Sequence, residues 1–183
     1  VFHKILEDFS KYIYINNLKW ENVTDKKIKE IIDASIENIL NDSKNKIFSS
    51  SSKYKFILDS IKKVSEKSIK ALSDHLKNGE FSPLDFEIGF GPKTSLPAIV
   101  IELKNNSKLI LTGTIDRIDV LRKEGKNYVK IIDYKTGEID YNLSDVYYGL
   151  KLQLLIYLDE IIKKGETLIG ENIVPGGIFY FKI

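Results

Sequence analysis

Two sequences, Gly113-Thr114-Ile115-Asp116-Arg117-Ile118-Asp119 and Ile131-Ile132-Asp133-Tyr134-Lys135, decide the fold of this chain. They lie in segments where side chains alternate in character, which is typical of β-strands. The Glu124-Gly125 pair stands between them and suits the centre of a two-residue turn. We therefore expect a long strand over residues 108–121 to pair with a second strand over 128–135 in an antiparallel hairpin.

This hairpin would bring two acidic side chains together. With the turn centred on Glu124-Gly125, Asp116 lies directly opposite Asp133, on the same face and with Cβ atoms about 4.5–5.5 Å apart. Lys135 projects to that face as well, because residues two apart on a strand point the same way. A turn one residue longer or shorter would change the register and separate these groups.

The chemistry of this trio has two interpretations. Two opposed carboxylates repel each other unless one is protonated or a cation bridges them, and Mg²⁺ is the hard ion that carboxylate oxygens prefer. Lys135 would then orient or activate water, or stabilise charge on a phosphate. The alternative is a structural ion cluster in which Lys135 neutralises two surface carboxylates, and the spacing alone does not separate the two.

The rest of the chain predicts an α/β fold. Helical spacing of apolar residues runs through the first 80 residues, where Thr24 is a candidate N-cap and the serine run 49–52 a candidate flexible connection. From Leu84 the pattern becomes alternating, with strands expected over 86–90 and 98–103. A helix from Ser144 to about Lys164 and a strand starting near Gly177 follow. We predict one domain over 1–183: a helical part (1–80) and an α/β core (81–183) with a mixed sheet flanked by helices.

Composition excludes several classes of site and location. The chain has no cysteine, which rules out disulfides, thiolate catalysis and cysteine-ligated zinc within it. No apolar run approaches the roughly 20 residues of a membrane span, and the first residues do not form a secretory signal. We therefore expect a cytoplasmic protein without membrane contact. The start at Val1 and the lack of methionine predict a piece of a longer protein.

Charge gives little guidance about partners. Lys and Arg total 28 against 26 Asp and Glu, a net charge of +2, so overall charge makes no case for nucleic acid. Between Lys44 and Lys77 lysines outnumber acidic residues, and such an excess would attract a phosphate backbone. A solvated helix face explains that run equally simply and is the more common case.

Three further pairs are candidates for a role. Gln153 and Tyr157 are four apart on the expected late helix and so share one face, where a packed polar pair is the simpler interpretation. His3 and Glu7 have the same spacing near the start of the chain. Arg117 and Asp119 fall on the strand face opposite to Asp116, and we expect them to form a solvent-side pair.

These motifs, in this order, resemble those of the RecB-like PD-(D/E)XK nuclease superfamily. The resemblance rests on Gly113–Asp119, Ile132–Lys135 and the Gly149–Leu158 segment with its Gln-x-x-x-Tyr pattern. Within that superfamily the chain is most similar to the C-terminal nuclease domain of AddB-type subunits of AddAB helicase–nucleases. The opening segment from His3 to Phe9 and the closing Pro175–Phe181 segment are similar to that domain too.

The resemblance implies a role for each matching residue. Asp116 and Asp133 would be carboxylate ligands of Mg²⁺ or Mn²⁺, the backbone carbonyl of Tyr134 would complete part of the shell, and His3 would add a ligand. Lys135 would be the catalytic lysine, and Gln153 and Tyr157 would shape the site and contact DNA. Glu87 matches an acidic position that precedes the core.

It also implies an activity and a setting. We expect a divalent-metal-dependent deoxyribonuclease that trims single-stranded ends of unwound duplex during double-strand-break repair and recombination, alongside an AddA-type helicase–nuclease partner. AddB-type proteins hold a 4Fe–4S cluster through cysteines that flank the nuclease core, so the cluster would belong to the parent protein and not to this cysteine-free chain. The alternatives are a catalytically inactive DNA-binding or structural module with a nuclease fold, and a stand-alone RecB-like nuclease.

Overall fold

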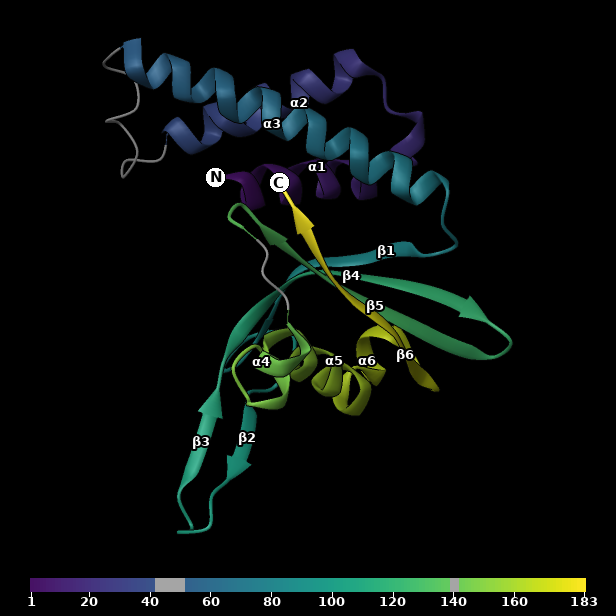
Figure 1. Ribbon diagram of the computed structural model, residues 1–183. Coiled ribbons are helices and arrows are strands. Elements are labelled where there is room, and N and C mark those ends of the chain that lie inside the picture. The colour runs from purple at the N-terminus through teal and green to yellow at the C-terminus, as the bar shows by residue number, and fades with distance from the viewer. Residues whose placement is uncertain (42–51, 139–141) are drawn as a thin grey trace. The chain divides into compact units, whose positions relative to one another are not determined.

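The computed structural model describes residues 1–41, 52–138 and 142–183, which form two compact units. One unit comprises Val1–Glu80 together with Ile183, and the other comprises Phe81–Lys182 (Figure 1). The serine run 49–52 lies almost wholly outside the described residues, and only Ser52 is placed, as the first residue of a helix. None of the described helices is both long and apolar enough to cross a membrane.

The first unit is helical, as the apolar spacing predicts. It contains α1 (Phe2–Ile15), a 3-10 turn at Trp20–Asn22, α2 (Asp25–Asn41) and α3 (Ser52–Lys77). The hydroxyl of Thr24 accepts a hydrogen bond from the Lys27 amide at 3.3 Å, which confirms it as the cap of α2. Phe9 packs edge-on against Trp20 with ring centroids 5.0 Å apart.

Lysines of α3 are partly neutralised within this unit. Lys62 forms an ion pair with Asp33 at 2.6 Å, and Lys70 forms one with Asp25 at 2.7 Å. Both acceptors belong to α2, so these two lysines serve helix packing as well as solvation. The side chains of residues 44, 46 and 53 lie outside the described part, so the lysine-rich segment is described only from residue 54 onward.

The second unit is built on a mixed four-stranded sheet in the order β1-β4-β5-β6, which confirms the predicted fold class. Its strands are β1 (Ser82–Phe90), β4 (Gly113–Lys123), β5 (Lys126–Lys135) and β6 (Ile173–Lys182). Neighbouring strands run antiparallel except for β5 and β6, which are parallel and are joined through α5 (Gln153–Lys164) and α6 (Glu166–Ile169).

Helix α5 lies against the sheet through one apolar stripe. Leu154, Tyr157 and Ile161 are three and four residues apart and therefore share a face. They join the core cluster with Ile118 and Val129 of the hairpin strands. Burying these side chains fixes which face of β4 and β5 is the core face, and hence where the acidic side chains of the same strands lie.

The predicted hairpin register is correct from the turn as far as the Arg117–Ile132 pair, but the predicted Asp116–Asp133 pair is not among the paired residues of β4 and β5 that the structure describes. Arg117 pairs with Ile132, Val120 with Val129 and Lys123 with Lys126, as a two-residue Glu124-Gly125 turn requires. Both turn residues have positive φ, 53° for Glu124 and 69° for Gly125, which is the geometry that matches the twist of a hairpin.

Other element boundaries differ from the prediction. The long strand is interrupted at Thr112: β3 (Lys108–Leu111) pairs with β2 (Ile99–Glu102) in a separate two-stranded ribbon, which Figure 1 shows running away from the main sheet. The single late helix is wrong as well. It is divided into α4 (Leu143–Tyr147) and α5 because Gly149 adopts φ 80°, and Asn142 caps α4 in place of Ser144.

Strand β6 starts at Ile173, four residues before the predicted start. Pro175 and two glycines mask the strand pattern, because proline lacks the N–H group that a central strand would donate. Strand β6 is at the edge of the sheet, and its register against β5 shifts between the Val129–Pro175 and Lys130–Gly177 pairs. An edge strand with an irregularity tolerates these residues.

Candidate metal centre

Asp133 and Lys135 lie side by side at the end of β5. The Lys135 Nζ atom is 2.7 Å from Asp133 Oδ2, and the Asp133 carboxylate is almost fully buried, with 4% of the residue exposed. Burial would lower the pKa of Lys135, but the hydrogen bond and the charge of Asp133 outweigh it and hold this pKa above its ordinary value. The lysine is therefore a cation at neutral pH.

Asp116 reaches the same end of β5 with its side chain. It stands next to Arg117, the last residue of the regular β4–β5 pairing, and its Oδ2 atom accepts a hydrogen bond from the Tyr134 amide at 2.6 Å. Ile115 and Ile118 both belong to the core cluster although they are three residues apart. Strict alternation is therefore interrupted between them, at Asp116 and Arg117, and this interruption lets the Asp116 carboxylate bond across the strands.

Glu87 is the residue of β1 opposite this interruption. It is flanked by the pairs Phe86–Arg117 and Ile88–Ile115, and its φ of 52° is unusual for a residue other than glycine. One of its carboxylate oxygens lies within 4.8 Å of one from Asp116. Residues in such sparsely populated conformations cluster at functional sites, where surrounding structure offsets the strain. The Asp116–Glu87 pair thus gathers negative charge at one point of the sheet.

Gln153 and Tyr157 share one face of α5, as their spacing predicts. The Gln153 side-chain amide donates a hydrogen bond to the Tyr157 hydroxyl at 2.9 Å, and the Tyr157 ring packs edge-on against Phe90 at 5.1 Å. Gly113, the first residue of β4, allows this approach: a Cβ there would lie 2.7 Å from the Phe90 ring and 3.1 Å from the Tyr157 hydroxyl. The pair is therefore fitted against the strand that carries Asp116.

The two remaining predicted ligands stand as follows. His3 is exposed on α1, in the helical unit, and its place in a metal shell stays a prediction. Tyr134 is buried between Asp133 and Lys135, with its amide committed to Asp116, and the role of its carbonyl also stays a prediction.

The side chains present fit a hard divalent cation. Glu87 and Asp116 hold two carboxylate oxygens within 4.8 Å of each other. Asp133 is not part of that group, and its buried Oδ2 atom forms an ion pair with Lys135. All three donors are oxygens, which suit Mg²⁺ or Mn²⁺ and not a soft metal.

The expected solvent-side position of Arg117 and Asp119 is wrong. They do form a pair, but Arg117 is 1% exposed and Asp119 is fully buried. Alternation places them on the face opposite the core cluster without showing what covers that face. Aromatic residues of neighbouring strands, such as Phe86, lie on the same side, with the Phe86 ring centroid 6.0 Å from the guanidinium carbon.

Comparison with known proteins agrees with these features. The family model of the PD-(D/E)XK nuclease superfamily matches residues 1–183. A protein of Alkaliphilus metalliredigens (strain QYMF), named as part of an ATP-dependent helicase/deoxyribonuclease, is 42% identical over 184 residues, and its namesake in Clostridium novyi (strain NT) is 41% identical over 181. These alignments cover 100% and 99% of this chain, which spans 16% of the length of each relative. The chain belongs to the PD-(D/E)XK nuclease superfamily.

Proposed function

We propose that this chain is a deoxyribonuclease domain that hydrolyses DNA phosphodiester bonds with Mg²⁺ or Mn²⁺. The observation that carries this proposal is the convergence of Asp116, Asp133 and Lys135 at the end of one hairpin, in a member of a nuclease superfamily. The two compact units would act together as one nuclease domain.

The metal would be held by oxygen ligands from three strands. Asp116 and Asp133 are the proposed carboxylate ligands, with the carbonyl of Tyr134 and the carboxylate of Glu87 beside them, and His3 is the proposed nitrogen ligand. The chemistry that such an ion supplies when bound is an activated water and neutralisation of phosphate charge. The Tyr134 amide fixes the Asp116 carboxylate, so one ligand is oriented before any ion arrives.

Lys135 has a different role in this proposal. Its pKa is held above the ordinary lysine value, so it acts as a fixed positive charge and not as a proton acceptor. An ammonium ion at this point would stabilise the negative charge that develops on a phosphate during hydrolysis. Gln153 and Tyr157, bonded to each other at the start of α5, would contact the DNA strand next to the reacting phosphate.

The wider setting is proposed from the relatives. They are named as parts of an ATP-dependent helicase/deoxyribonuclease, and we infer that this chain likewise belongs to a larger helicase–nuclease protein. It would work in the cytoplasm with an AddA-type partner, trimming unwound single strands during double-strand-break repair and recombination. A 4Fe–4S cluster would be held outside this cysteine-free sequence.

The test is digestion of an end-labelled single-stranded oligonucleotide in Mg²⁺ by the wild type, by Asp133→Asn and by the control Asp159→Asn. Asp159 is an exposed carboxylate of α5 that pairs with Lys163, far along the helix from Gln153. We expect the wild type and the control to cut at the same rate, and Asp133→Asn to be slower by about 100-fold or more. Wild-type protein that binds the oligonucleotide in Mg²⁺ without cutting it would favour the inactive DNA-binding module.

A further inference from the structure

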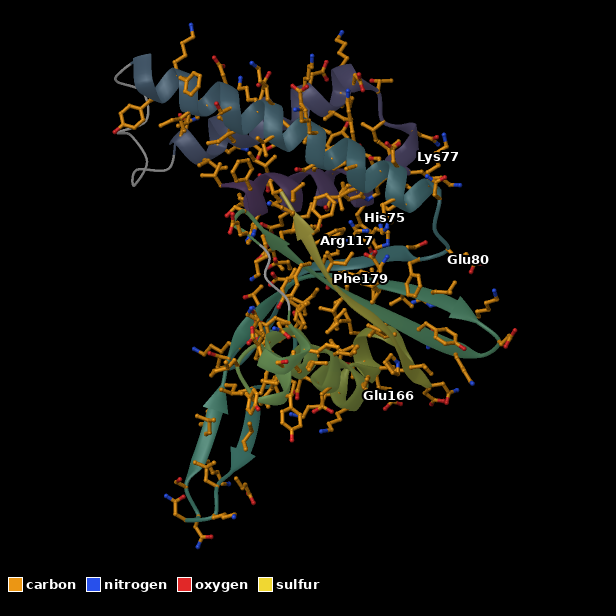
Figure 2. All side chains as sticks on the ribbon, viewed as in Figure 1. His75, Lys77, Glu80, Arg117, Glu166 and Phe179 are labelled. Atoms are coloured by element: carbon orange, nitrogen blue, oxygen red, sulfur yellow. The ribbon has the colours of Figure 1, made fainter. Side chains whose placement is uncertain are left out.

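A buried ionic network lies on the face of β4 and β5 opposite the core cluster. The Arg117 guanidinium donates two hydrogen bonds to Asp119, from Nε to Oδ1 at 2.5 Å and from Nη2 to Oδ2 at 2.8 Å. Lys130, the cross-strand partner of Asp119, places its Nζ atom 3.2 Å from Asp119 Oδ2. Figure 2 labels Arg117 among the side chains over the sheet.

Aromatic rings complete the surroundings of this network. Lys130 Nζ lies 4.8 Å from the ring centroid of Phe81 and 5.7 Å from that of Phe179, which Figure 2 also labels. Rings at these distances attract a cation through their negative faces. The network therefore has a defined geometry, with Asp119 fixed by two cations and one of those cations fixed by two rings.

Stability alone is a weak reason for such a network. Removing charges from water is costly, and apolar residues of similar volume in their place are often as stable or more stable. A buried ionic network is therefore better explained by a geometric requirement of its neighbours. Tyr134 is the neighbour that connects this network to the metal centre.

Arg117 acts on the side chain of Tyr134. Arg117 pairs with Ile132, and Tyr134 lies two residues further along β5, so the two side chains are diagonal neighbours on the same face and within reach of each other. The ring of Tyr134 also packs edge-on against Phe181, with centroids 6.0 Å apart. The side chain of Tyr134 is thus held on the buried face of the sheet.

The backbone of Tyr134 belongs to the metal centre. Its amide donates to Asp116 at 2.6 Å, and it stands between Asp133 and Lys135 in the chain. Arg117 follows Asp116 directly and is the last residue of the regular pairing. Beyond this residue Asp116 bonds the Tyr134 amide, while Arg117 lies diagonally next to Tyr134 on the opposite face of the sheet.

We propose that Arg117, oriented by Asp119, is a positioning residue that holds Tyr134 in place and thereby sets the spacing between the Asp116 and Asp133 carboxylates. The inference rests on the proposed function of that site. A planar guanidinium can bond both oxygens of Asp119 through the one edge formed by Nε and Nη2 and still has a further donor, Nη1, for the phenol, a geometry that a lysine ammonium lacks. Arg117 touches neither the proposed metal nor the DNA.

The experiment compares Mn²⁺ affinity, by calorimetry, in the wild type, Arg117→Lys, Tyr134→Phe and the double variant. Tyr134→Phe keeps the ring and the amide, so it perturbs folding little, and Tyr128→Phe on the same face of β5 is its matched control. We expect each single variant to bind Mn²⁺ about tenfold more weakly, as is common when a group that orients a metal ligand is lost. The double variant should bind Mn²⁺ no more weakly than either single variant, because the two substitutions remove the same contact.

A second readout separates positioning from a general loss of stability. In both single variants, kcat on a single-stranded substrate should fall by about tenfold while KM stays nearly unchanged. The positive charge that Arg117→Lys retains should not restore kcat. The proposal is overturned if Arg117→Lys and Tyr134→Phe match the wild type in Mn²⁺ affinity while Asp133→Asn loses it. If the folded wild type itself binds no Mn²⁺ and cuts no DNA, the proposed function and this inference fail together.

Discussion

At the end of β5, Lys135 and a metal ion would compete for one carboxylate. Asp133 Oδ2 is buried and lies 2.7 Å from the Lys135 ammonium, which stays protonated because its pKa is raised. The lysine thus prevents a buried carboxylate from standing unpaired in the metal-free protein. If Asp133 held a metal ion as proposed, the same ammonium would be available to a phosphate oxygen, and one side chain would serve both states.

Replacing Lys135 separates these two roles. Lys135→Met should cut single-stranded DNA about 100-fold or more slowly, because a preorganised positive charge is lost from the site. Its Mn²⁺ affinity should equal or exceed that of the wild type, because Asp133 no longer has an ammonium partner. Calorimetry and the digestion assay on one preparation measure both. A variant that loses Mn²⁺ binding along with cleavage would make Lys135 a structural part of the metal shell.

Single residues differ in how far the sequence predicts them. Asp133 and Lys135 are two apart on a strand, so their shared face follows from the pleat alone. The bond from the Tyr134 amide to Asp116 does not follow, since it depends on an interruption of β4 that only Ile115 and Ile118 together reveal. The Phe86 ring beside the buried Arg117 belongs to another strand, so the local pattern around Arg117 does not reveal it.

At the scale of elements, the β4–β5 turn determines where the carboxylates meet. Glu124 sits at φ 53°, a conformation that costs an ordinary L-residue about 1 kcal/mol and that asparagine adopts more readily. Glu124→Asn should therefore raise the free energy of unfolding by about 0.5–1 kcal/mol. Urea denaturation followed by the far-UV circular dichroism of the sheet measures this change. Glu138→Asn, an exposed change outside the turn, is the control and should have no effect. A destabilised Glu124→Asn would contradict the turn geometry.

Helix α1, which carries His3, has its own pH dependence. Burial would raise the pKa of Glu7, but hydrogen bonds from Lys11 and Lys4 outweigh it and hold this pKa below the ordinary value. A lowered carboxyl pKa contributes stability above the pKa of the unfolded chain, about 4.5, and that stability is lost as pH falls through the folded value.

Glu7→Gln tests this dependence. At pH 7 this substitution should lower the free energy of unfolding by about 0.5–1 kcal/mol, the size expected for a helix ion pair whose carboxylate is largely shielded from solvent. The difference from the wild type should shrink as pH falls through the folded pKa of Glu7, so it should be smaller at pH 3 than at pH 7. Far-UV circular dichroism in urea at the two pH values measures it. A difference that is the same at both pH values would exclude the ionic contribution.

Helix and strand types follow from apolar periodicity here, while boundaries depend on backbone chemistry. The apolar stripe over 144–164 looks continuous, yet Gly149 at φ 80° ends the first helix. The sequence predicts a later start for β6 because Pro175 resembles a breaker, and only the edge position of this strand makes the proline acceptable. The hairpin register is predictable from its turn as far as the Arg117–Ile132 pair, because the turn residues fix it, whereas the interruption at Asp116 is not.

At the scale of the whole molecule, the core is apolar and would not depend on metal. The cluster between α5 and the sheet consists of aliphatic and aromatic residues. Chelation with EDTA should therefore abolish DNA cleavage while far-UV and near-UV circular dichroism remain those of a folded protein. Unfolding on chelation would assign the metal a structural role, as in small zinc domains.

Overall charge and family membership contribute different information. A net charge of +2 gives no general attraction to DNA, so the substrate would be held by local contacts around the metal centre. The family model that places the chain in its superfamily matches residues 1–183.

The most direct test is calorimetric titration of Mn²⁺ into the wild type, Asp116→Ala, Asp133→Ala and Asp159→Ala, each shown to be folded. The account predicts binding by the wild type and by Asp159→Ala, whose missing carboxylate is exposed and paired with Lys163. It predicts no measurable binding by Asp116→Ala or Asp133→Ala, because each removes an oxygen ligand of one shared site. A folded wild type that binds no Mn²⁺, or an Asp133→Ala variant that binds it as tightly as the wild type, would contradict the account.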